Sequence, residues 1–151
     1  MDIISYHISD EDIKEIEEVL RKLITSIGID IAVVGDEGGR LIAYLPLGDG
    51  SHHIAERFCV VSASVLGALD QIDNLVQSKM NFFTEGLASA IYIKISPRKF
   101  FISVKFSKGV MLGTVKLFVD KAMKELEPIF QQIRERSNNK FPGLKFDMLE
   151  I

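Results

Sequence analysis

Cysteine is nearly absent from this sequence, and Cys59 is its one residue of this type. A single cysteine excludes an internal disulfide and any metal site built on paired cysteines. Also missing is a run of about 20 apolar residues, the length that crosses a bilayer. The opening MDIISYHISDEDI has neither the basic part nor the long apolar part of a secretory signal. We therefore expect a cytoplasmic protein with no integral membrane segment.

An excess of basic residues is missing as well, since the formal net charge is -3. Domains that bind nucleic acid usually carry a strong basic excess, so we expect no nucleic acid as a partner. The 151 residues, 47% of them hydrophobic and 26% charged, fit one globular domain. A chain of this length buries roughly 70% of its unfolded surface, which is enough for a sizeable core.

Charge is nonetheless unevenly distributed along the chain. Residues 86–119 contain no acidic residue, whereas the basic residues there are Lys94, Arg98, Lys99, Lys105, Lys108 and Lys116. The ordinary interpretation is a set of solvated lysines on strands. The alternative is a weakly basic face that binds an acidic protein or anionic lipid headgroups.

Motifs for catalysis and for cofactor binding are largely absent. No GxxxxGK[ST] string occurs, and the glycine-rich segment 35–39 has no following lysine. Asp70 and Asp73 have the spacing of a carboxylate pair but fit the solvated end of a helix better. No histidine or carboxylate is evidently placed to activate Cys59. We predict a protein that is not an enzyme, with no catalytic residue and no cofactor.

A metal site would have to use His52 and His53, with Asp49 or Glu56 nearby. Adjacent histidines at the start of a helix have no fixed coordination spacing, and no HExxH or CxxC motif supports them. Exposed or helix-capping histidines are the simpler interpretation. We therefore expect no metal.

Hydrophobic periodicity and turn residues predict the elements in the first half of the chain. A helix begins after Ser9, with Asp12 three residues on as its capping-box partner, and ends at Gly28. A hairpin follows, IDIAVVGD and RLIAYLPL, around a glycine-rich turn. A long helix then spans residues 51–74.

The second half is predicted as three strands and a helix. The helix begins near Val110, and Pro128 is expected to kink or restart it. The apolar chain end should fold back on the domain or serve as a docking segment. The strands cover 76–83, 87–96 and 99–108. The predicted units are an N-terminal extension, 1–9, one domain, 10–137, and a C-terminal tail, 138–151.

The helix at 51–74 has an uncharged surface about twice as wide as packing on its own sheet requires. One stripe, expected to pack on the sheet, carries large side chains: Ile54, Phe58, Val61, Val65, Leu69 and Ile72. The neighbouring stripe carries mostly small ones. Contiguous exposed apolar surface usually marks an interaction site. We predict that this second stripe pairs with the same helix of another subunit through Ala55, Cys59, Ser62 and Leu66.

Two segments carry a resemblance to a known family. IGIDIAVVGDEGGRLIAY leads into the helix at 51–74, and GVMLGTVKLFVDKAMKEL opens the last helix. With the element order α-β-β-α-β-β-β-α, they make residues 10–137 resemble the Roadblock/dynein light chain family. Within it, LGTVKL at 112–117 is most similar to bacterial gliding proteins that act as dimeric partners of a Ras-like GTPase.

The resemblance implies a layered α+β fold of the profilin-like kind, within the broad α/β class. Its five-stranded antiparallel sheet would have the order 2-1-5-4-3, with the first and last helices on one face and the second helix on the other. Dimers of the family pair third strand with third strand and second helix with second helix. This adds Met80 and Phe82 to the predicted dimer interface.

Residues at the two predicted sheet edges agree with that pairing. Arg40 and Pro46 protect the edge at 40–47, because proline cannot donate to a β-ladder and charge discourages docking. In the edge at 76–83, Lys79 is the single charged residue that would discourage docking. The less protected edge is thus the one that the family uses.

The resemblance further implies a noncatalytic homodimer that regulates or scaffolds a small Ras-like GTPase. Activators of GTPases often insert an arginine, but Arg40, Arg57 and Arg98 fit solvated positions, and the family is understood to position the GTPase's own residues. On a helical projection, the face opposite the core is small and lightly charged. We predict that the GTPase docks there, on Arg57, Val60, Ala63, Ser64, Gly67 and Gln71.

A structural or ligand-sensing domain with no GTPase partner is the alternative function. Layered profilin-like folds also host small-molecule pockets, and a fold does not determine a function. The sequence offers no convergent set of buried polar residues that would line such a pocket, which favours the GTPase regulator.

Overall fold

The computed structural model describes residues 6–73 and 81–140, apart from the side chains at 73 and 138–140. The predicted tail beyond residue 140, Met80 and Lys79 lie outside the described residues. In chain order the elements are α1 (Asp10–Ile27), β1 (Ile29–Asp36), β2 (Leu41–Leu45), α2 (Ser51–Asp73), β3 (Asn81–Glu85), β4 (Ser89–Ile95), β5 (Phe100–Ser107) and α3 (Leu112–Lys140). The predicted element order is confirmed.

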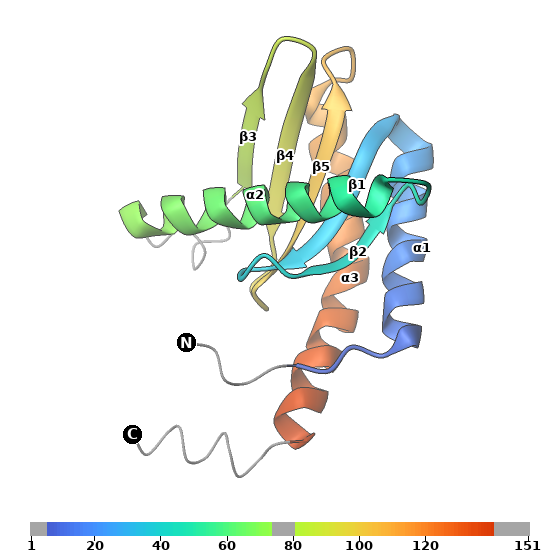
Figure 1. Ribbon diagram of the computed structural model, residues 1–151, viewed down its shortest axis with the longest axis vertical. Coiled ribbons are helices and arrows are strands. Elements are labelled where there is room, and N and C mark those ends of the chain that lie inside the picture. The colour runs from blue at the N-terminus through green and yellow to red at the C-terminus, as the bar shows by residue number, and fades with distance from the viewer. Residues whose placement is uncertain (1–5, 74–80, 141–151) are drawn as a thin grey trace.

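The strands form one antiparallel sheet in the order β2-β1-β5-β4-β3. β1 and β5 lie in the middle, paired from Ile29 opposite Phe106 to Asp36 opposite Phe100. Figure 1 shows α1 and α3 on one face of the sheet and α2 crossing the other face. The layered α+β fold expected from the sequence is confirmed, including its strand order and the distribution of helices.

Local signals fix both ends of α1. The Ser9 hydroxyl accepts a hydrogen bond from the Asp12 amide at 3.1 Å, and the Asp12 carboxylate accepts one from the Ser9 amide at 2.9 Å. This reciprocal pair satisfies two of the amides that a helix leaves unbonded at its start. Gly28 ends the helix with φ 66°, a left-handed conformation that costs glycine no steric strain.

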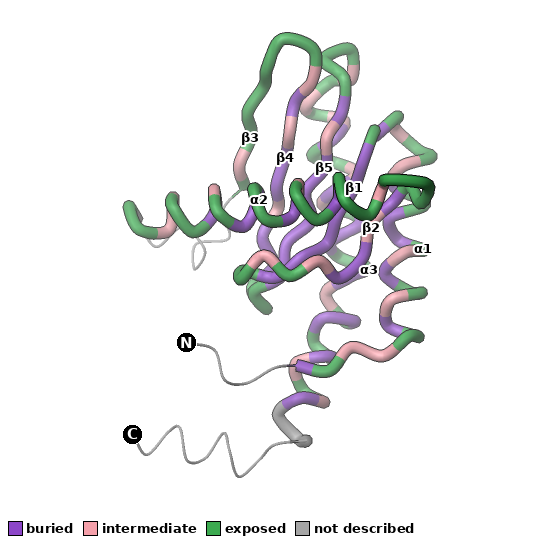
Figure 2. The backbone as a smooth tube through the Cα atoms, viewed as in Figure 1, coloured by how far each residue is buried: buried purple, intermediate pink, exposed green. Residues whose placement is uncertain are grey.

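Two clusters of buried side chains fill the spaces between the sheet and its helices. Figure 2 marks the buried residues in purple along the backbone, many of them on β1, β4 and β5. β5 contributes side chains to both clusters, because successive side chains of a strand point to opposite faces of the sheet. Phe100, Ile102 and Val104 pack beneath α1 and α3. Phe101 packs beneath α2, together with Ile93 of β4. The first cluster is the larger, since two helices cover that face.

Part of the predicted N-terminal extension packs on the domain. Tyr6 is 8% exposed, and its hydroxyl donates a hydrogen bond to the Asp36 carboxylate at the end of β1. Its ring meets Phe100 edge-on, with 5.3 Å between centroids, and lies under the guanidinium groups of Arg40 and Arg134. An aromatic ring held this way anchors the segment to the sheet.

Some predicted boundaries in the second half of the chain differ from the structure. β3 runs to Glu85 rather than to 83, with its predicted start at 76 outside the described residues, and α3 begins at Leu112 rather than near 110. Pro128 lies inside α3, which is assigned as one helix through that position and ends at Lys140. Pro128 is exposed, so water can bond the carbonyl that would have accepted its missing amide proton. None of the described helices has both the length and the apolarity to cross a membrane.

Candidate interaction surface on the second helix

The face of α2 that packs on the sheet is built from small side chains. Ala55 and Cys59 are fully buried, and Leu66 is 6% exposed. The Ser62 hydroxyl donates a hydrogen bond to the Ser103 hydroxyl of β5 at 2.8 Å, which satisfies a polar pair inside this layer. The helix therefore approaches the sheet closely along this stripe.

The predicted roles of the two stripes on α2 are thus wrong. The stripe assigned to a subunit interface, Ala55, Cys59, Ser62 and Leu66, faces the sheet of its own domain. The large stripe assigned to the sheet is largely exposed, with Ile54 at 60%, Val61 at 55% and Ile72 at 79%. The sheet itself supplies much of the bulk of this layer, mainly from Phe101, so the helix residues packed on it are mostly small, with Leu66 as the exception.

The large stripe forms an uncovered apolar surface, which we call the α2 ridge: Ile54, Phe58, Val61, Val65, Leu69 and Ile72. It borders a part of the sheet that α2 leaves open. There Phe82 of β3 and Ile91 of β4 are half-buried against the same cluster as Phe58. Near the start of α2, Ile54 and Ile31 help to line a hollow of about 240 Å³. Asp30 and Lys105 line the same hollow, so the apolar ridge and the open sheet lie on one side of the domain with this ion pair between them.

β3 is a sheet edge next to this face. It pairs with β4 on one side only, and four of its five residues are exposed. Its described residues include one charge, Glu85, and no proline. Phe82, from the predicted dimer interface, is half-buried on the α2 side of the sheet. An edge strand with one charged residue and no proline can pair with another strand.

Five of the six residues predicted to contact a GTPase are exposed on α2. Val60 is 53% exposed, and Arg57, Ser64, Gly67 and Gln71 are exposed as well. Ala63 is not, since it is 7% exposed. A Cβ placed on Gly39 would lie 3.7 Å from the Ala63 methyl group, so the β1–β2 turn covers this position. Ala63 is therefore removed from the docking face.

Two sequence candidates for chemistry, His52 and Cys59, have described surroundings, whereas the Asp73 side chain lies outside the described residues. His52 lies 3.5 Å from Glu56 across one helical turn, with both side chains more than half exposed. Burial, and then the charge of Asp36, raise the pKa of the Cys59 thiol to about 12, so the thiol stays protonated. Among the described residues, no group of three or more His, Cys, Asp or Glu side chains could hold a metal ion.

Four of the six basic residues of 86–119 lie close to an acidic side chain. Lys94 lies 3.0 Å from Asp120. Lys105 and Lys108 each lie 3.9 Å from an acid, Asp30 and Glu85 respectively, and Lys99 lies at the same distance from Glu37. These exposed or half-exposed pairs contribute little to stability, but they neutralise the surface locally. The arrangement favours the interpretation of solvated strand lysines.

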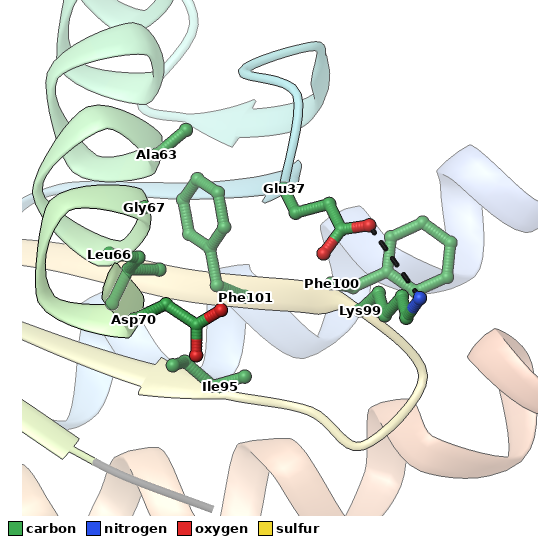
Figure 3. A pocket seen from close by; sticks show the side chains of 9 residues that line it. All are labelled: Glu37, Ala63, Leu66, Gly67, Asp70, Ile95, Lys99, Phe100 and Phe101. Carbon is green, nitrogen blue, oxygen red and sulfur yellow. Dashed lines mark ion pairs between the residues drawn. The ribbon is translucent and has the colours of Figure 1, made fainter. Parts of the chain in front are cut away.

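A pocket of about 130 Å³ lies on the other flank of α2, away from the ridge. It opens between the helix, the β1–β2 turn and the β4–β5 turn (Figure 3). Ala63, Leu66 and Phe101 provide apolar lining, and Glu37, Asp70 and Lys99 provide charge. Sequence reasoning missed this pocket, because its residues come from three separate segments, at 37, 63–70 and 95–101, and no local motif joins them.

Known proteins resemble this chain in sequence and in fold. No family profile matches the chain. A protein of Aquifex aeolicus (strain VF5), described as uncharacterized, is 22% identical over 138 residues, which cover 89% of this chain and 85% of that protein. Among solved structures, Myxococcus xanthus MglB has a TM-score of 0.72 at 23% identity, over 84% of this chain and 96% of that chain.

Two more solved structures extend the comparison. An MglB structure described as having a tetrameric arrangement has a TM-score of 0.72 at 18% identity, over 85% of this chain and 97% of that chain. A Roadblock/LC7 domain from Streptomyces avermitilis has a TM-score of 0.64 at 12% identity, over 76% of this chain and 96% of that chain. The chain therefore has the Roadblock fold found in MglB.

Proposed function

We propose that this protein is a homodimeric, noncatalytic regulator or scaffold of a small Ras-like GTPase. One observation carries the proposal: large apolar side chains of the α2 ridge are exposed on the side of the sheet where β3 leaves an open edge. On a fold shared with MglB, such a face is suited to a second copy of the same chain. The GTPase partner is what the sequence resemblance to the Roadblock family implies.

A two-fold axis beside β3 would use both parts of this face at once. Antiparallel pairing of β3 with its copy would continue the sheet from one subunit into the other. Because the ridge lies on the same side of the sheet as the open surface around Phe82, the two α2 helices would then cover each other's exposed residues. An isologous contact of this kind is the commonest form of homodimer.

The GTPase is assigned to the outer face of the paired α2 helices. The exposed residues there are Arg57, Val60, Ser64, Gly67 and Gln71. They are small or uncharged apart from Arg57, which is the one arginine of α2. A flat surface of this composition suits the contact with a folded protein better than the capture of a small ligand. Any stimulation of hydrolysis would come from positioning the GTPase's own residues.

Sedimentation and calorimetry together test the proposal. We expect the purified chain to sediment as a dimer at micromolar concentration. We also expect it to bind a small Ras-like GTPase of its source cell, with different affinities for the GDP form and for the form loaded with a nonhydrolysable GTP analogue. A monomer would contradict the dimer assignment. A dimer that binds none of those GTPases in either state would favour the structural or ligand-sensing alternative.

A further inference from the structure

Tyr6 contacts the two residues that bracket the β1–β2 turn at 37–39. Its hydroxyl donates a hydrogen bond to the buried carboxylate of Asp36, and the Arg40 guanidinium lies 5.0 Å from the centroid of its ring. The ring is also held by α3, because the Arg134 guanidinium lies 4.7 Å from the same centroid. One side chain of the N-terminal segment thus joins both ends of this turn to α3.

The Asp36 carboxylate also holds the backbone of the turn. Its Oδ1 accepts hydrogen bonds from the Gly38 amide at 3.0 Å and from the Arg40 amide at 2.9 Å, whereas the Tyr6 hydroxyl bonds Oδ2. Aspartate side chains commonly fix a turn through amides that follow them in the chain. Because both oxygens belong to one planar group, the bond to Oδ2 orients Oδ1 toward the two amides.

The turn touches α2 on the other face of the sheet. A Cβ placed on Gly39 would lie 3.7 Å from the Val60 Cα and from the Ala63 Cβ. Val60 is 53% exposed and belongs to the proposed docking face. Tyr6 packs in the cluster beneath α1 and α3, whereas Ala63 packs in the cluster beneath α2. Bonds through Asp36 and the turn therefore connect the two faces of the sheet at one end.

We propose that Tyr6 is a positioning residue, which holds the β1–β2 turn against α2 and so sets the border of the docking face. The effect on the docking face rests on the proposed function, whereas the effect on the turn does not. A buried carboxylate oxygen that loses its donor is costly, so without the hydroxyl the Asp36 side chain would rotate toward water. That rotation takes Oδ1 away from the two amides and releases the turn from Val60.

Backbone bonds inside the turn are the competing explanation for its position. The Asp36 amide donates to the Arg40 carbonyl at 3.1 Å, and the Gly39 amide donates to the Asp36 carbonyl at 2.9 Å. These bonds close the turn, but they join residues of the turn only to one another. They therefore leave its distance from α2 to other contacts, and two adjacent glycines, Gly38 and Gly39, give its backbone freedom to move.

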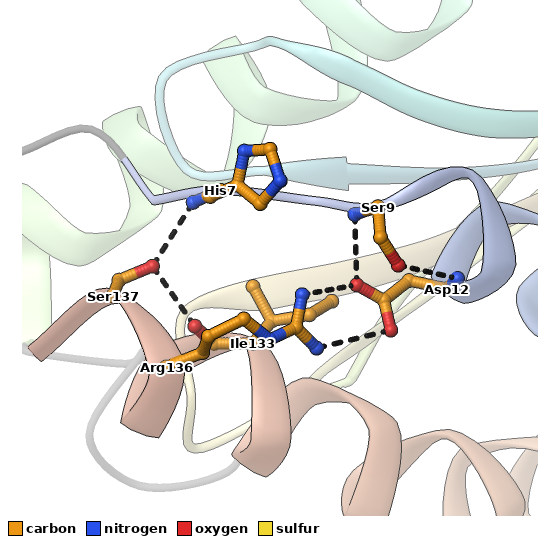
Figure 4. Close-up of polar contacts among 6 residues, drawn as sticks. All are labelled: His7, Ser9, Asp12, Ile133, Arg136 and Ser137. Atoms are coloured by element: carbon orange, nitrogen blue, oxygen red, sulfur yellow. Dashed lines mark hydrogen bonds and ion pairs between the residues drawn. The ribbon is translucent and has the colours of Figure 1, made fainter. Parts of the chain in front are cut away.

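Two variants of the N-terminal segment and its contacts separate these explanations. Tyr6→Phe keeps the ring, with its contacts to Phe100 and Arg134, and removes only the hydroxyl. Ser137→Ala is the matched control, because it removes the other bond of the same segment, the one from the His7 amide at 3.0 Å (Figure 4). Each variant loosens the segment by one hydrogen bond, but only Tyr6→Phe acts on Asp36.

Amide hydrogen exchange and amide shifts, measured by NMR on the full chain, test the effect on the turn. In Tyr6→Phe we expect the Gly38 and Arg40 amides to exchange at least about fivefold faster than in the parent. The amide signals of Val60 and Ala63 should shift, although they lie on the opposite face of the sheet from residue 6. Ser137→Ala should leave all four amides as in the parent. Unchanged amides in Tyr6→Phe, or equal changes in both variants, would overturn the proposal.

Calorimetry tests the effect on the docking face, with the same small Ras-like GTPase, loaded with a nonhydrolysable GTP analogue, that tests the proposed function. Tyr6→Phe should weaken its binding by about three- to tenfold, and Ser137→Ala should not. Equal affinities of Tyr6→Phe and the parent would remove the docking face from the role of Tyr6. A parent that binds no GTPase, with the amide changes present, would overturn the proposed function but support the positioning of the turn. Thermal unfolding checks that both variants remain folded.

Discussion

A Cβ placed on Gly35 of β1 would lie 2.3 Å from the Sγ of Cys59 on α2 and 2.8 Å from the Cζ of Phe101. No real Cβ makes contacts that short, so helix and strand approach each other here only because residue 35 has no side chain. This contact sets the height of α2 above the sheet. It explains why the small stripe of the helix, and not the large one, is buried.

Gly35→Ala should therefore destabilise the protein strongly. We expect a loss of about 3 kcal/mol or more in the free energy of unfolding, because the added methyl group overpacks a layer with no free space. Denaturant unfolding followed by circular dichroism measures it. Gly67→Ala is the control and should stabilise by about 0.5–1 kcal/mol, since that helical position is exposed and open.

The double variant Gly35→Ala/Cys59→Ala tests whether contact with the Cys59 Sγ causes the loss of stability in Gly35→Ala. If the Sγ is the main obstacle, the double variant should lose clearly less stability than the sum of the two single variants. Unfolding free energies that simply add, or a Gly35→Ala variant as stable as the parent, would mean that the close contact does not control the packing of α2.

The Cys59 thiol should be almost unreactive in the folded protein. Burial, and then the charge of Asp36, raise its pKa to about 12, so the thiolate that attacks a disulfide reagent is scarce at pH 8. We expect labelling by a chromogenic disulfide reagent at the rate of unfolding, and complete labelling in denaturant. A Leu117→Cys variant provides the exposed comparison, since Leu117 on α3 is 59% exposed. Rapid labelling of the parent under native conditions would contradict the burial of this thiol.

Asp12 joins the start of α1 to the end of α3. Figure 4 shows its carboxylate accepting hydrogen bonds from Arg136, at 2.8 and 3.2 Å, and from the Ser9 amide. Ser137 of α3 accepts a further bond from the His7 amide at 3.0 Å. Burial raises the pKa of Asp12, but the bonds from Arg136 and Ser9 outweigh burial and hold the pKa below its ordinary value.

Asp12→Asn should thus destabilise the protein in a pH-dependent way. A carboxyl whose folded pKa is depressed stabilises the fold above its unfolded pKa, about 3.9, and loses that effect as the pH falls through the folded pKa. We expect a loss of about 2 kcal/mol at pH 7 that shrinks below about pH 4. Arg21→Gln, which breaks the exposed pair with Glu18, should cost under about 0.5 kcal/mol. A difference for Asp12→Asn that is constant with pH would contradict this.

The features of the fold that could be predicted from the sequence are those determined by a few neighbouring residues. The capping box of Ser9 and Asp12 and the left-handed Gly28 mark both ends of α1 directly. Strand order is not local, and its prediction came from the resemblance to the Roadblock family. The predicted third strand stops at 83, two residues before β3 ends at Glu85 opposite Ala90 of β4, because Thr84, Glu85 and Gly86 are typical turn residues.

The orientation of α2 could not be predicted from the sequence, and neither could the pocket. Periodicity gives the angle between two stripes but not which of them faces the sheet, since that depends on the size of Phe101 and on the missing side chain of Gly35. The pocket depends on the meeting of two turns that hold Glu37 and Lys99, which are far apart in the chain. The same is true of ion pairs such as Lys105 with Asp30.

Val61→Glu should convert the proposed dimer to a monomer. Val61 lies in the α2 ridge and is exposed in the isolated domain, so a glutamate there leaves the fold intact but would be buried without a partner in the dimer. Leu66→Glu cannot test the dimer interface, because Leu66 packs on the sheet of its own domain and a charge there would disturb the fold. Leu117→Glu on α3 is the matched control, since Leu117 is 59% exposed. Sedimentation equilibrium should show a monomer for Val61→Glu only, and a dimer for that variant would remove the ridge from the interface.

Ser64→Arg should abolish GTPase binding and leave the dimer intact. Ser64 is exposed on the proposed docking face, and its hydroxyl only donates to the Val60 carbonyl of its own helix, at 2.8 Å. A long charged side chain there would block a flat contact without disturbing the core. Ala63→Arg would not be informative, because Ala63 is buried beside the β1–β2 turn. Gln132→Arg, on an exposed part of α3, is the control. Calorimetry that finds the parent affinity in Ser64→Arg, or an equal loss in Gln132→Arg, would exclude this face as the docking site.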